Sequence, residues 1–328
     1  MPQKTITQIT IFLGLIVVVL ASIVAVSYFN PTKTIVKAPS TPSNTTSNLS
    51  TSNSKLKVST SFYPLEFLAK EIGGQLVDAK NITPAGSEPH EYEPTQQQII
   101  DIQNADLLLY NGAGLESWTT KVEQASFKPK SILELSKSFE LSELDEDGKK
   151  VQDPHIWLSP NNYIKMAKFV NTTLQQGQSK EKQAIIQSNA ETLVKKLETL
   201  SSNFKTKLNS TNCKNTKFVT NHDAFNYLAK DYGLEALSIS GLSPEAEPTT
   251  KELADLASII KSNNIKYVLT ETIASPKLAQ TLAKEVGITT LEMNPLEGLS
   301  DEEITSGKNY INIMESNLQN LATALECK

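Results

Sequence analysis

Histidine and cysteine are scarce in this chain of 328 residues, which contains three of the first and two of the second. The chain also lacks an excess of Lys and Arg, and its formal net charge is −5. A nucleic-acid backbone and an anionic lipid surface both require concentrated positive charge, so we expect the chain to bind neither. With 39% hydrophobic and 20% charged residues, the composition is that of a folded protein, and the length suits about two domains.

Charged residues are absent from residues 9–29, an apolar run long enough to cross a bilayer as a helix. Two interpretations stay open: a transmembrane anchor with Lys4 on the cytoplasmic side, or a signal peptide that is cleaved near Ala25. Both predict that the rest of the chain is extracytoplasmic, tethered to the cell membrane in the first case and secreted or periplasmic in the second. After this segment (1–30), residues 31–54 are rich in Ser, Thr, Pro and Asn and predict a flexible tether.

The two cysteines, Cys213 and Cys327, are far from the apolar run, directly after which a lipid anchor would need a cysteine. In an exported protein such a pair is typical of a disulfide, which here would close a long loop. In the chain-entropy model this cross-link contributes about 4–5 kcal/mol to stability. Two unpaired structural thiols are the alternative.

Apolar strand-like runs alternate with helical segments from residue 55 to about residue 177, and again from residue 215 onward. Such alternation predicts βαβ units, and therefore a mainly parallel sheet in each half. We expect strands at 56–62, 77–83, 105–111, 131–135, 217–221, 234–240, 266–271 and 289–293. We expect helices at 65–72, 95–104, 224–232, 250–262, 276–286 and 301–325.

A single long helix is expected between the halves, because residues 181–209 carry one apolar stripe that no Gly or Pro interrupts. The predicted fold class is therefore α/β, with two α/β lobes of mainly parallel sheets joined by one long rigid helix. The lobes comprise residues 55–180 and 211–328, and the connecting helix comprises residues 181–210. Open α/β sheets bind ligands at the carboxyl ends of their strands, so we expect a site in the crevice between the lobes.

All three histidines, His90, His155 and His222, follow predicted strands and therefore belong to the crevice side of their lobes. A single histidine is more often a structural or surface residue than a ligand. Three at corresponding positions, with none elsewhere in the chain, indicate a shared role. Neutral imidazole is the most common transition-metal ligand, and three imidazoles with one carboxylate complete the tetrahedral coordination that zinc prefers. The sequence therefore predicts a metal site.

The fourth ligand has several acidic candidates near the crevice. Glu297 comes just after the last predicted strand, and Glu271, at the end of the strand before it, competes with Glu297. Glu91, next to His90, is a weaker candidate. Each acid also has a simpler interpretation as a solvated residue, and Glu271 has one as a hydrogen-bond partner of a ligand.

Six motifs follow one another in order and at characteristic separations: GSEPHEYEPT, DLLLYNGAGLESW, DPHIWLSP, NHDAFNYLAKDYGL, GLSPEAEP and LEMNPLEGLS. Through these motifs, over residues 56–326, the chain resembles the metal-binding component of ABC importers for zinc or manganese, the cluster A-I solute-binding proteins. The resemblance implies two lobes joined by a long helix, with limited hinge motion and a divalent metal held between the lobes. It also implies delivery of this metal to an ABC permease driven by a separate ATPase. We expect the protein to be a monomer.

By this resemblance the first three metal ligands are His90, His155 and His222, and a histidine at the third position is typical of the zinc branch. Many relatives have an aspartate where this chain has Asn294, and asparagine is a poor substitute for a carboxylate. The branch with N-P-L-E uses its glutamate, which favours Glu297 over Glu271 as the fourth ligand. The resemblance thus implies Zn²⁺ as the metal, with Mn²⁺ or iron as the alternative.

The segment before His155 departs from the zinc branch, whose members often have a histidine-rich loop there. Residues 140–148 are acidic instead and predict an exposed loop, with weak pre-concentration of cations as the alternative. A zinc hydrolase and a metal-binding surface adhesin are the competing functions. A catalytic zinc keeps an open coordination position, which Glu297 would fill, and the chain has no H-E-x-x-H motif, so we do not expect an enzyme.

Overall fold

The computed structural model describes residues 54–123, 129–146, 148–209 and 211–328. The predicted membrane or signal segment and nearly all of the predicted tether lie outside these residues. The chain from Asn53 to Lys328 belongs to one compact unit. No helix in the described part of the chain is long and apolar enough to cross a membrane.

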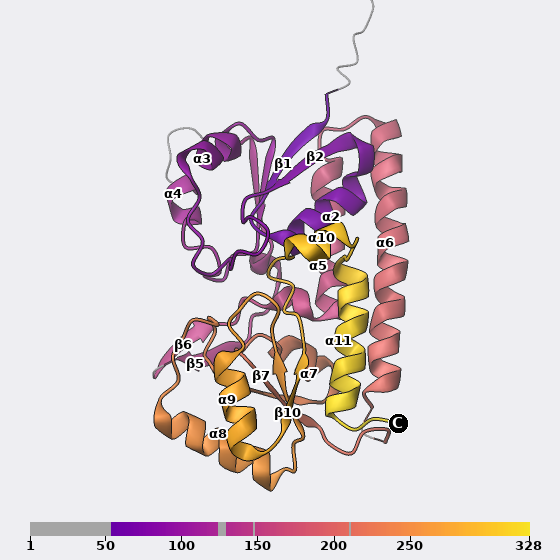
Figure 1. Cartoon of the computed structure of the whole chain (residues 1–328). Coiled ribbons are helices and arrows are strands. Elements are labelled where there is room, and N and C mark those ends of the chain that lie inside the picture. The colour runs from indigo at the N-terminus through magenta and orange to yellow at the C-terminus, as the bar shows by residue number, and fades with distance from the viewer. Residues whose placement is uncertain (1–53, 124–128, 147, 210) are drawn as a thin grey trace, which may run out of the picture. The chain divides into compact units, whose positions relative to one another are not determined.

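The first half of this unit contains a four-stranded parallel sheet (Figure 1). Its strands are β1 (Leu56–Thr60), β2 (Val77–Asn81), β3 (Leu107–Tyr110) and β4 (Ser131–Glu134). Its helices are α2 (Tyr63–Gly73), α3 (Gln96–Gln103), α4 (Thr119–Glu123) and α5 (Pro160–Gln175). The strand order is β2-β1-β3-β4, and β3 is buried along its whole length, as a strand covered on both faces should be.

The second half contains another four-stranded parallel sheet. Its strands are β7 (Lys217–Thr220), β8 (Glu235–Ser238), β9 (Tyr267–Thr270) and β10 (Thr289–Glu292), connected by α7 (Asn226–Tyr232), α8 (Thr250–Ser262) and α9 (Lys277–Val286). The order β10-β9-β7-β8 repeats the plan of the first sheet: the first strand lies between the second and the third. Each sheet therefore has a switch point between its first and third strands, where α/β proteins bind ligands. The predicted α/β class with mainly parallel sheets is confirmed.

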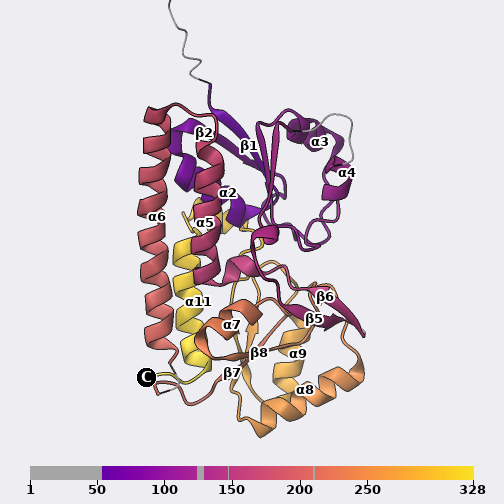
Figure 2. The ribbon, with the colours of Figure 1, turned by 180° about the vertical axis from the view of Figure 1, so that it is seen from behind.

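The long connecting helix is confirmed as α6 (Lys180–Lys207), whose 28 residues extend about 42 Å at about 1.5 Å per residue. It packs against α2 and α5 of the first half and against α11 (Tyr310–Ala324) of the second (Figures 1 and 2). The proposed boundaries of the lobes stay a prediction. The buried stripe of α6 consists of Ile186, Ala190, Leu193, Leu197, Leu200 and Phe204, as the spacing predicts.

The predicted helix over residues 301–325 is wrong in one respect, because the structure has two helices there. α10 (Asp301–Thr305) ends before Gly307, whose φ of +76° is the left-handed conformation that terminates helices. α11 begins after Asn309, whose side chain accepts hydrogen bonds from the first backbone N–H groups of the new helix. Ile304 is the one large apolar residue among residues 301–309, so apolar spacing does not support a helix across the break, and Gly307 was the available stop signal.

The prediction of an acidic loop over residues 140–148 is also wrong for residues 143–146. β5 (Glu143–Glu146) and β6 (Lys149–Gln152) form an antiparallel hairpin in which Leu144 pairs with Val151. Two apolar residues are too few to produce a visible alternation in the sequence. The Glu146 carboxylate accepts a hydrogen bond from the backbone N–H of Leu242, so the hairpin contacts the loop that follows β8.

The predicted disulfide is present between Cys213 and Cys327, which are 114 residues apart in the sequence. Cys213 follows the carboxyl end of α6, and Cys327 follows α11. The disulfide therefore attaches the last residues of the chain to the end of the connecting helix, and backbone hydrogen bonds to the carbonyl of Leu325 from the two residues after Cys213 reinforce the attachment.

Candidate metal centre

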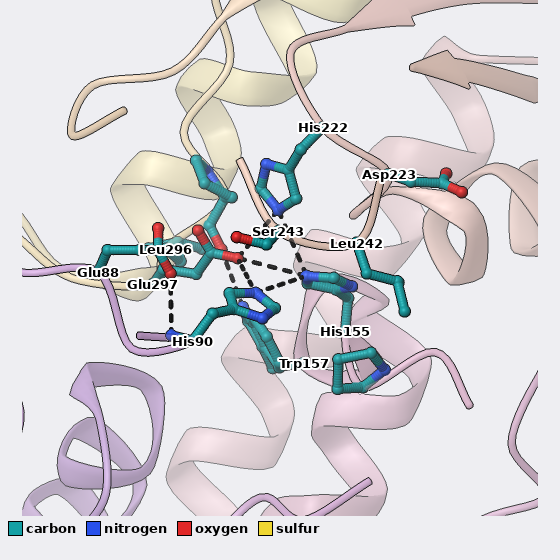
Figure 3. Close-up of polar contacts among 12 residues, drawn as sticks. Glu88, His90, His155, Trp157, His222, Asp223, Leu242, Ser243, Leu296 and Glu297 are labelled. Carbon is teal, nitrogen blue, oxygen red and sulfur yellow. Dashed lines mark hydrogen bonds and ion pairs between the residues drawn. The ribbon is translucent and has the colours of Figure 1, made fainter. Parts of the chain in front are cut away.

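Three imidazoles and one carboxylate, those of His90, His155, His222 and Glu297, meet at one point (Figure 3). The Nε2 atom of His155 is 3.3 Å from Nε2 of His90 and 3.3 Å from Nε2 of His222. The Oε1 atom of Glu297 is 3.4 Å from Nε2 of both His90 and His155, and 3.1 Å from Nε2 of His222. Ligand atoms about 2.0–2.1 Å from the centre of a tetrahedron are about 3.3–3.4 Å from one another, so these five distances match the edges of a tetrahedral zinc site. All four ligand atoms lie within 4.8 Å of one another.

Each member of the group comes from a loop that follows a strand. His90 lies between β2 and α3, His222 comes two residues after β7, and Glu297 follows β10. His155 follows β6, a strand that the sequence did not predict, and directly precedes the short 3-10 helix Ile156–Leu158. The side chain of His90 is 10% exposed, whereas those of the other three are 0–2% exposed, so solvent reaches the group from the side of His90.

Two further carboxylates hold the opposite ring nitrogens of the buried histidines. Asp153 Oδ1 is 2.9 Å from Nδ1 of His155, and Glu271 Oε1 is 2.6 Å from Nδ1 of His222. Each carboxylate also accepts the backbone N–H of the same histidine. A proton held on Nδ1 leaves the lone pair of Nε2 free for a metal, which is the usual arrangement behind a histidine ligand. His222 and Glu271 follow β7 and β9, so this pair occupies the switch point of the second sheet.

The competing acidic candidates lie outside the group of four. Glu271 contacts His222 from behind, and Glu91 is exposed. Asn294 is buried but uses its side chain to shape its own loop: its amide donates to Glu303 Oε1 at 3.0 Å, and its oxygen accepts the backbone N–H of Leu296 at 2.7 Å. The asparagine in the N-P-L-E motif therefore supports the loop that carries Glu297.

The charges around His222 favour its protonated form in the metal-free protein. Burial disfavours the imidazolium, but the carboxylates of Glu271 and Glu297 outweigh burial and raise the pKa of His222 well above its ordinary value. Burial also acts against the charged form of Glu297, yet the charge of His222 and hydrogen bonds from the histidines hold the pKa of Glu297 well below its ordinary value. The proton on Nε2 of His222 thus occupies the position where a metal would bind.

The other members of the group differ in their titration. Burial opposes charge on His155, but hydrogen bonds with Asp153 and Glu297 raise its pKa. Burial lowers the pKa of His90. Burial and the charge of Glu297 raise the pKa of the neighbouring Glu88 carboxyl to about 9, so this acid is neutral at pH 7 and adds no negative charge to the group.

Sequence reasoning did not identify Glu116, whose buried carboxylate fills the switch point of the first sheet. It accepts hydrogen bonds from the hydroxyl of Ser61 at 2.5 Å and from the backbone N–H of Asn111 at 2.8 Å. The side-chain amide of Asn111 in turn donates to the carbonyl of Pro154 at 2.9 Å, directly before His155. Glu116 therefore supports the His155 segment, and its place in the DLLLYNGAGLESW motif was the available signal.

The substitution Glu271→Gln tests whether this carboxylate orients His222. An amide oxygen can still accept a hydrogen bond, but the negative charge behind the imidazole is lost. We expect the zinc dissociation constant to rise about 10–100-fold, as is typical when a residue that orients a histidine ligand is changed. Competition titration against a zinc chelator measures the constant, with Glu285→Gln on the exposed side of α9 as the control. A constant equal to that of the control would contradict this role.

Two parallel α/β sheets, a long connecting helix and a group of three histidines and one glutamate define a metal-binding protein of the cluster A-I solute-binding class. The model of the family described as zinc-uptake complex component A, periplasmic (ZnuA), matches residues 58–324. The chain belongs to this family.

Curated relatives are similar over most of the chain. The zinc-binding lipoprotein AdcA of Streptococcus pneumoniae is 38% identical over 287 residues, which cover 84% of this chain and 57% of the relative. The chain thus spans a little over half the length of AdcA. The high-affinity zinc uptake system protein ZnuA of Bacillus subtilis is 36% identical over 298 residues, which cover 87% of this chain and 92% of the relative.

A solved structure matches the fold as well. The crystal structure of the Zn(II)-bound ZnuA-like domain of Streptococcus pneumoniae AdcA has a TM-score of 0.72 and 38% sequence identity to this chain. The match covers 83% of this chain and 100% of that domain. The two proteins are therefore similar in sequence as well as in fold.

Proposed function

We propose that the protein captures Zn²⁺ outside the cytoplasm and delivers it to an ABC-type uptake transporter, in which a separate ATPase drives a permease. The observation that carries this proposal is the group of three imidazole nitrogens and one carboxylate oxygen, in which five of the six distances between ligand atoms are 3.1–3.4 Å. Zinc accepts such a nitrogen-rich tetrahedral set, whereas manganese prefers oxygen ligands and higher coordination. The name of the Bacillus subtilis relative, which describes zinc uptake, supports the same metal.

In this proposal His90, His155 and His222 bind the metal through Nε2, and Glu297 binds it through Oε1. Four protein ligands complete the tetrahedron and leave no position for a reactive water, which suits a cargo metal and disfavours hydrolysis. The limited exposure at His90 provides the side from which the metal enters and leaves. The first lobe would supply His90 and His155, and the second would supply His222 and Glu297, so hinge motion between the lobes would open the site.

The amino-terminal part of the chain would place this unit at the outer face of the membrane. The apolar run at residues 9–29 would act as an anchor, or as a signal peptide that is removed after export. With an anchor, residues 31–54 would serve as a flexible tether that keeps the metal-binding unit near its permease.

Metal selectivity tests the proposed function. We expect the purified protein to bind about one Zn²⁺ in a tetrahedral site, and to bind Mn²⁺ at least about 100-fold more weakly, because imidazole-rich sites follow the Irving–Williams order. Competition titrations of both metals against a chromophoric chelator measure the two constants. A preference for Mn²⁺, or a zinc stoichiometry far below one, would contradict zinc as the cargo.

Zinc affinity should decrease as the pH is lowered, because imidazole must be neutral to bind a metal. The pKa values of His222 and His155 are raised, so protons compete with zinc below these raised values, and the competition disappears above them. We expect the apparent affinity to fall about tenfold per pH unit for each proton displaced, as the pH is lowered through these raised values. Calorimetric titration in buffers of different ionisation enthalpy counts the protons released. Equal affinities at about pH 5 and about pH 8 would rule out the three-histidine site.

A further inference from the structure

Trp157 lies two residues after His155 and is completely buried. Its indole ring contacts the imidazole of His155, with 5.1 Å between the ring centroids, and the ring of Phe62, with 4.7 Å. Its backbone carbonyl accepts a hydrogen bond of 2.6 Å from the hydroxyl of Tyr310 on α11. Two ring contacts therefore hold the indole, and the Tyr310 bond holds the backbone that carries it.

The indole N–H of Trp157 donates to the backbone carbonyl of Pro295 across 2.8 Å. Pro295 lies two residues before Glu297, as Trp157 lies two residues after His155. The hydrogen bond thus connects the two segments that carry these ligands, although its partners are 138 residues apart in the sequence. Figure 3 shows Trp157 beside the four ligand side chains.

The backbone between Pro295 and Glu297 needs support from its surroundings. Leu296 has a φ of +60°, in the left-handed region that leucine rarely adopts, and such a conformation persists where the contacts around it hold it. Asn294, the residue before Pro295, is held by Asn317: the side-chain amide of Asn317 makes two hydrogen bonds with the backbone of Asn294. These bonds attach the loop to its own half of the molecule, whereas the Trp157 bond attaches it to the segment of His155.

We propose that Trp157 is a positioning residue of the metal centre: its indole N–H fixes the distance between the Glu297 carboxylate and the His155 imidazole. The two ligand atoms are 3.4 Å apart, as one edge of a tetrahedral zinc site requires. Without the indole N–H, the buried carbonyl of Pro295 loses its partner, and the strained loop can relax and move Glu297 away from His155. This inference rests on the proposed function, because it assigns Glu297 and His155 to the same metal.

The chain offers a matched control for this hydrogen bond, because it contains one other tryptophan. Trp118 is 1% exposed, and its indole nitrogen has no hydrogen-bond partner within the described residues. Trp118→Phe and Trp157→Phe therefore make the same change in a buried ring, but the second also removes a hydrogen bond near the ligands. Co²⁺ serves as the probe of geometry, because its visible absorption is strong in a four-coordinate site and weak at higher coordination.

We expect the parent protein and Trp118→Phe to give the strong four-coordinate Co²⁺ spectrum. Trp157→Phe should lose most of this intensity, and its Zn²⁺ dissociation constant should rise about 10–100-fold. Equal spectra and equal constants for the two variants would overturn the proposal. A parent protein that lacks the four-coordinate spectrum would contradict the proposed function instead.

Unfolding of the metal-free proteins separates an effect on the site from a general loss of stability, since a structural role would change stability and leave the spectrum of the folded protein intact. If Trp157→Phe does not fold, 3-benzothienylalanine at position 157 keeps the two-ring shape and has sulfur in place of the N–H group. The same result is expected for this analogue, and an unchanged Co²⁺ spectrum would again overturn the proposal.

Discussion

Replacing His222 by alanine should abolish stoichiometric zinc binding. The variant loses one of the four proposed ligands. Among the three histidines, His222 is the one whose Nε2 lies closest to Oε1 of Glu297, at 3.1 Å. Residues that merely orient a ligand contribute about 10–100-fold to affinity, so the loss of a ligand should raise the dissociation constant by more than about 100-fold. We expect about one zinc per chain in the parent, as one tetrahedral site requires, and a small fraction of that in the variant. Anaerobic metal analysis by mass spectrometry measures both.

The same substitution should also destabilise the metal-free protein, because His222, whose pKa is raised well above its ordinary value, lies between two buried carboxylates, those of Glu271 and Glu297. Removal of one partner of a buried ion pair typically costs about 3–5 kcal/mol. Circular dichroism therefore has to show that the variant is folded before its metal content is interpreted. The chain has no histidine outside the site, so Gln280→Ala on the exposed side of α9 serves as the control. Zinc content unaffected by His222→Ala would mean that the ligand set is wrong and that the metal has to be reassigned.

Removing the disulfide should cause the largest loss of stability at a distance from the metal. The double variant Cys213→Ala, Cys327→Ala opens a loop defined by a sequence separation of 114 residues. In the chain-entropy model this costs about 4–5 kcal/mol, near the upper end of the 2–5 kcal/mol that is typical for native disulfides. Denaturant-induced unfolding measures the free energy of the oxidised parent and of the variant.

Reduction of the parent protein provides the control for this experiment. The reduced parent should unfold at the same denaturant concentration as the double variant, because both lack the cross-link. Zinc affinity should stay within a few-fold of the parent value in both, since the disulfide joins the ends of α6 and α11, whereas the four proposed ligands lie in loops that follow strands. If the oxidised parent and the variant unfold together, the cross-link does not stabilise the folded state.

Local sequence signals predicted elements well where a start or stop signal agreed with the apolar period. The bounds of α8 were predicted as they stand, and the structure begins this helix with a capping box of Thr249 and Glu252. α6 differs from its prediction, residues 181–210, by one residue at its start and three at its end, since one uninterrupted stripe defines it. α5 was not predicted, although Ser159 caps it and Pro160 begins it.

The sequence by itself determined the α/β class, the connecting helix, the pair of cysteines and the three histidines, because each depends on periodicity or on the identity of a few rare residues. Tertiary structure decided how the acidic residues divide their roles. Glu297 and Glu271 are both glutamates that follow strands, yet the first meets Nε2 of His222 and the second meets its Nδ1. The partners in these contacts are 75 and 49 residues apart, and the Trp157 bond to Pro295 spans 138. Which atom of a side chain faces which neighbour depends on how the two halves pack in three dimensions. Residue spacing along the sequence does not determine that packing.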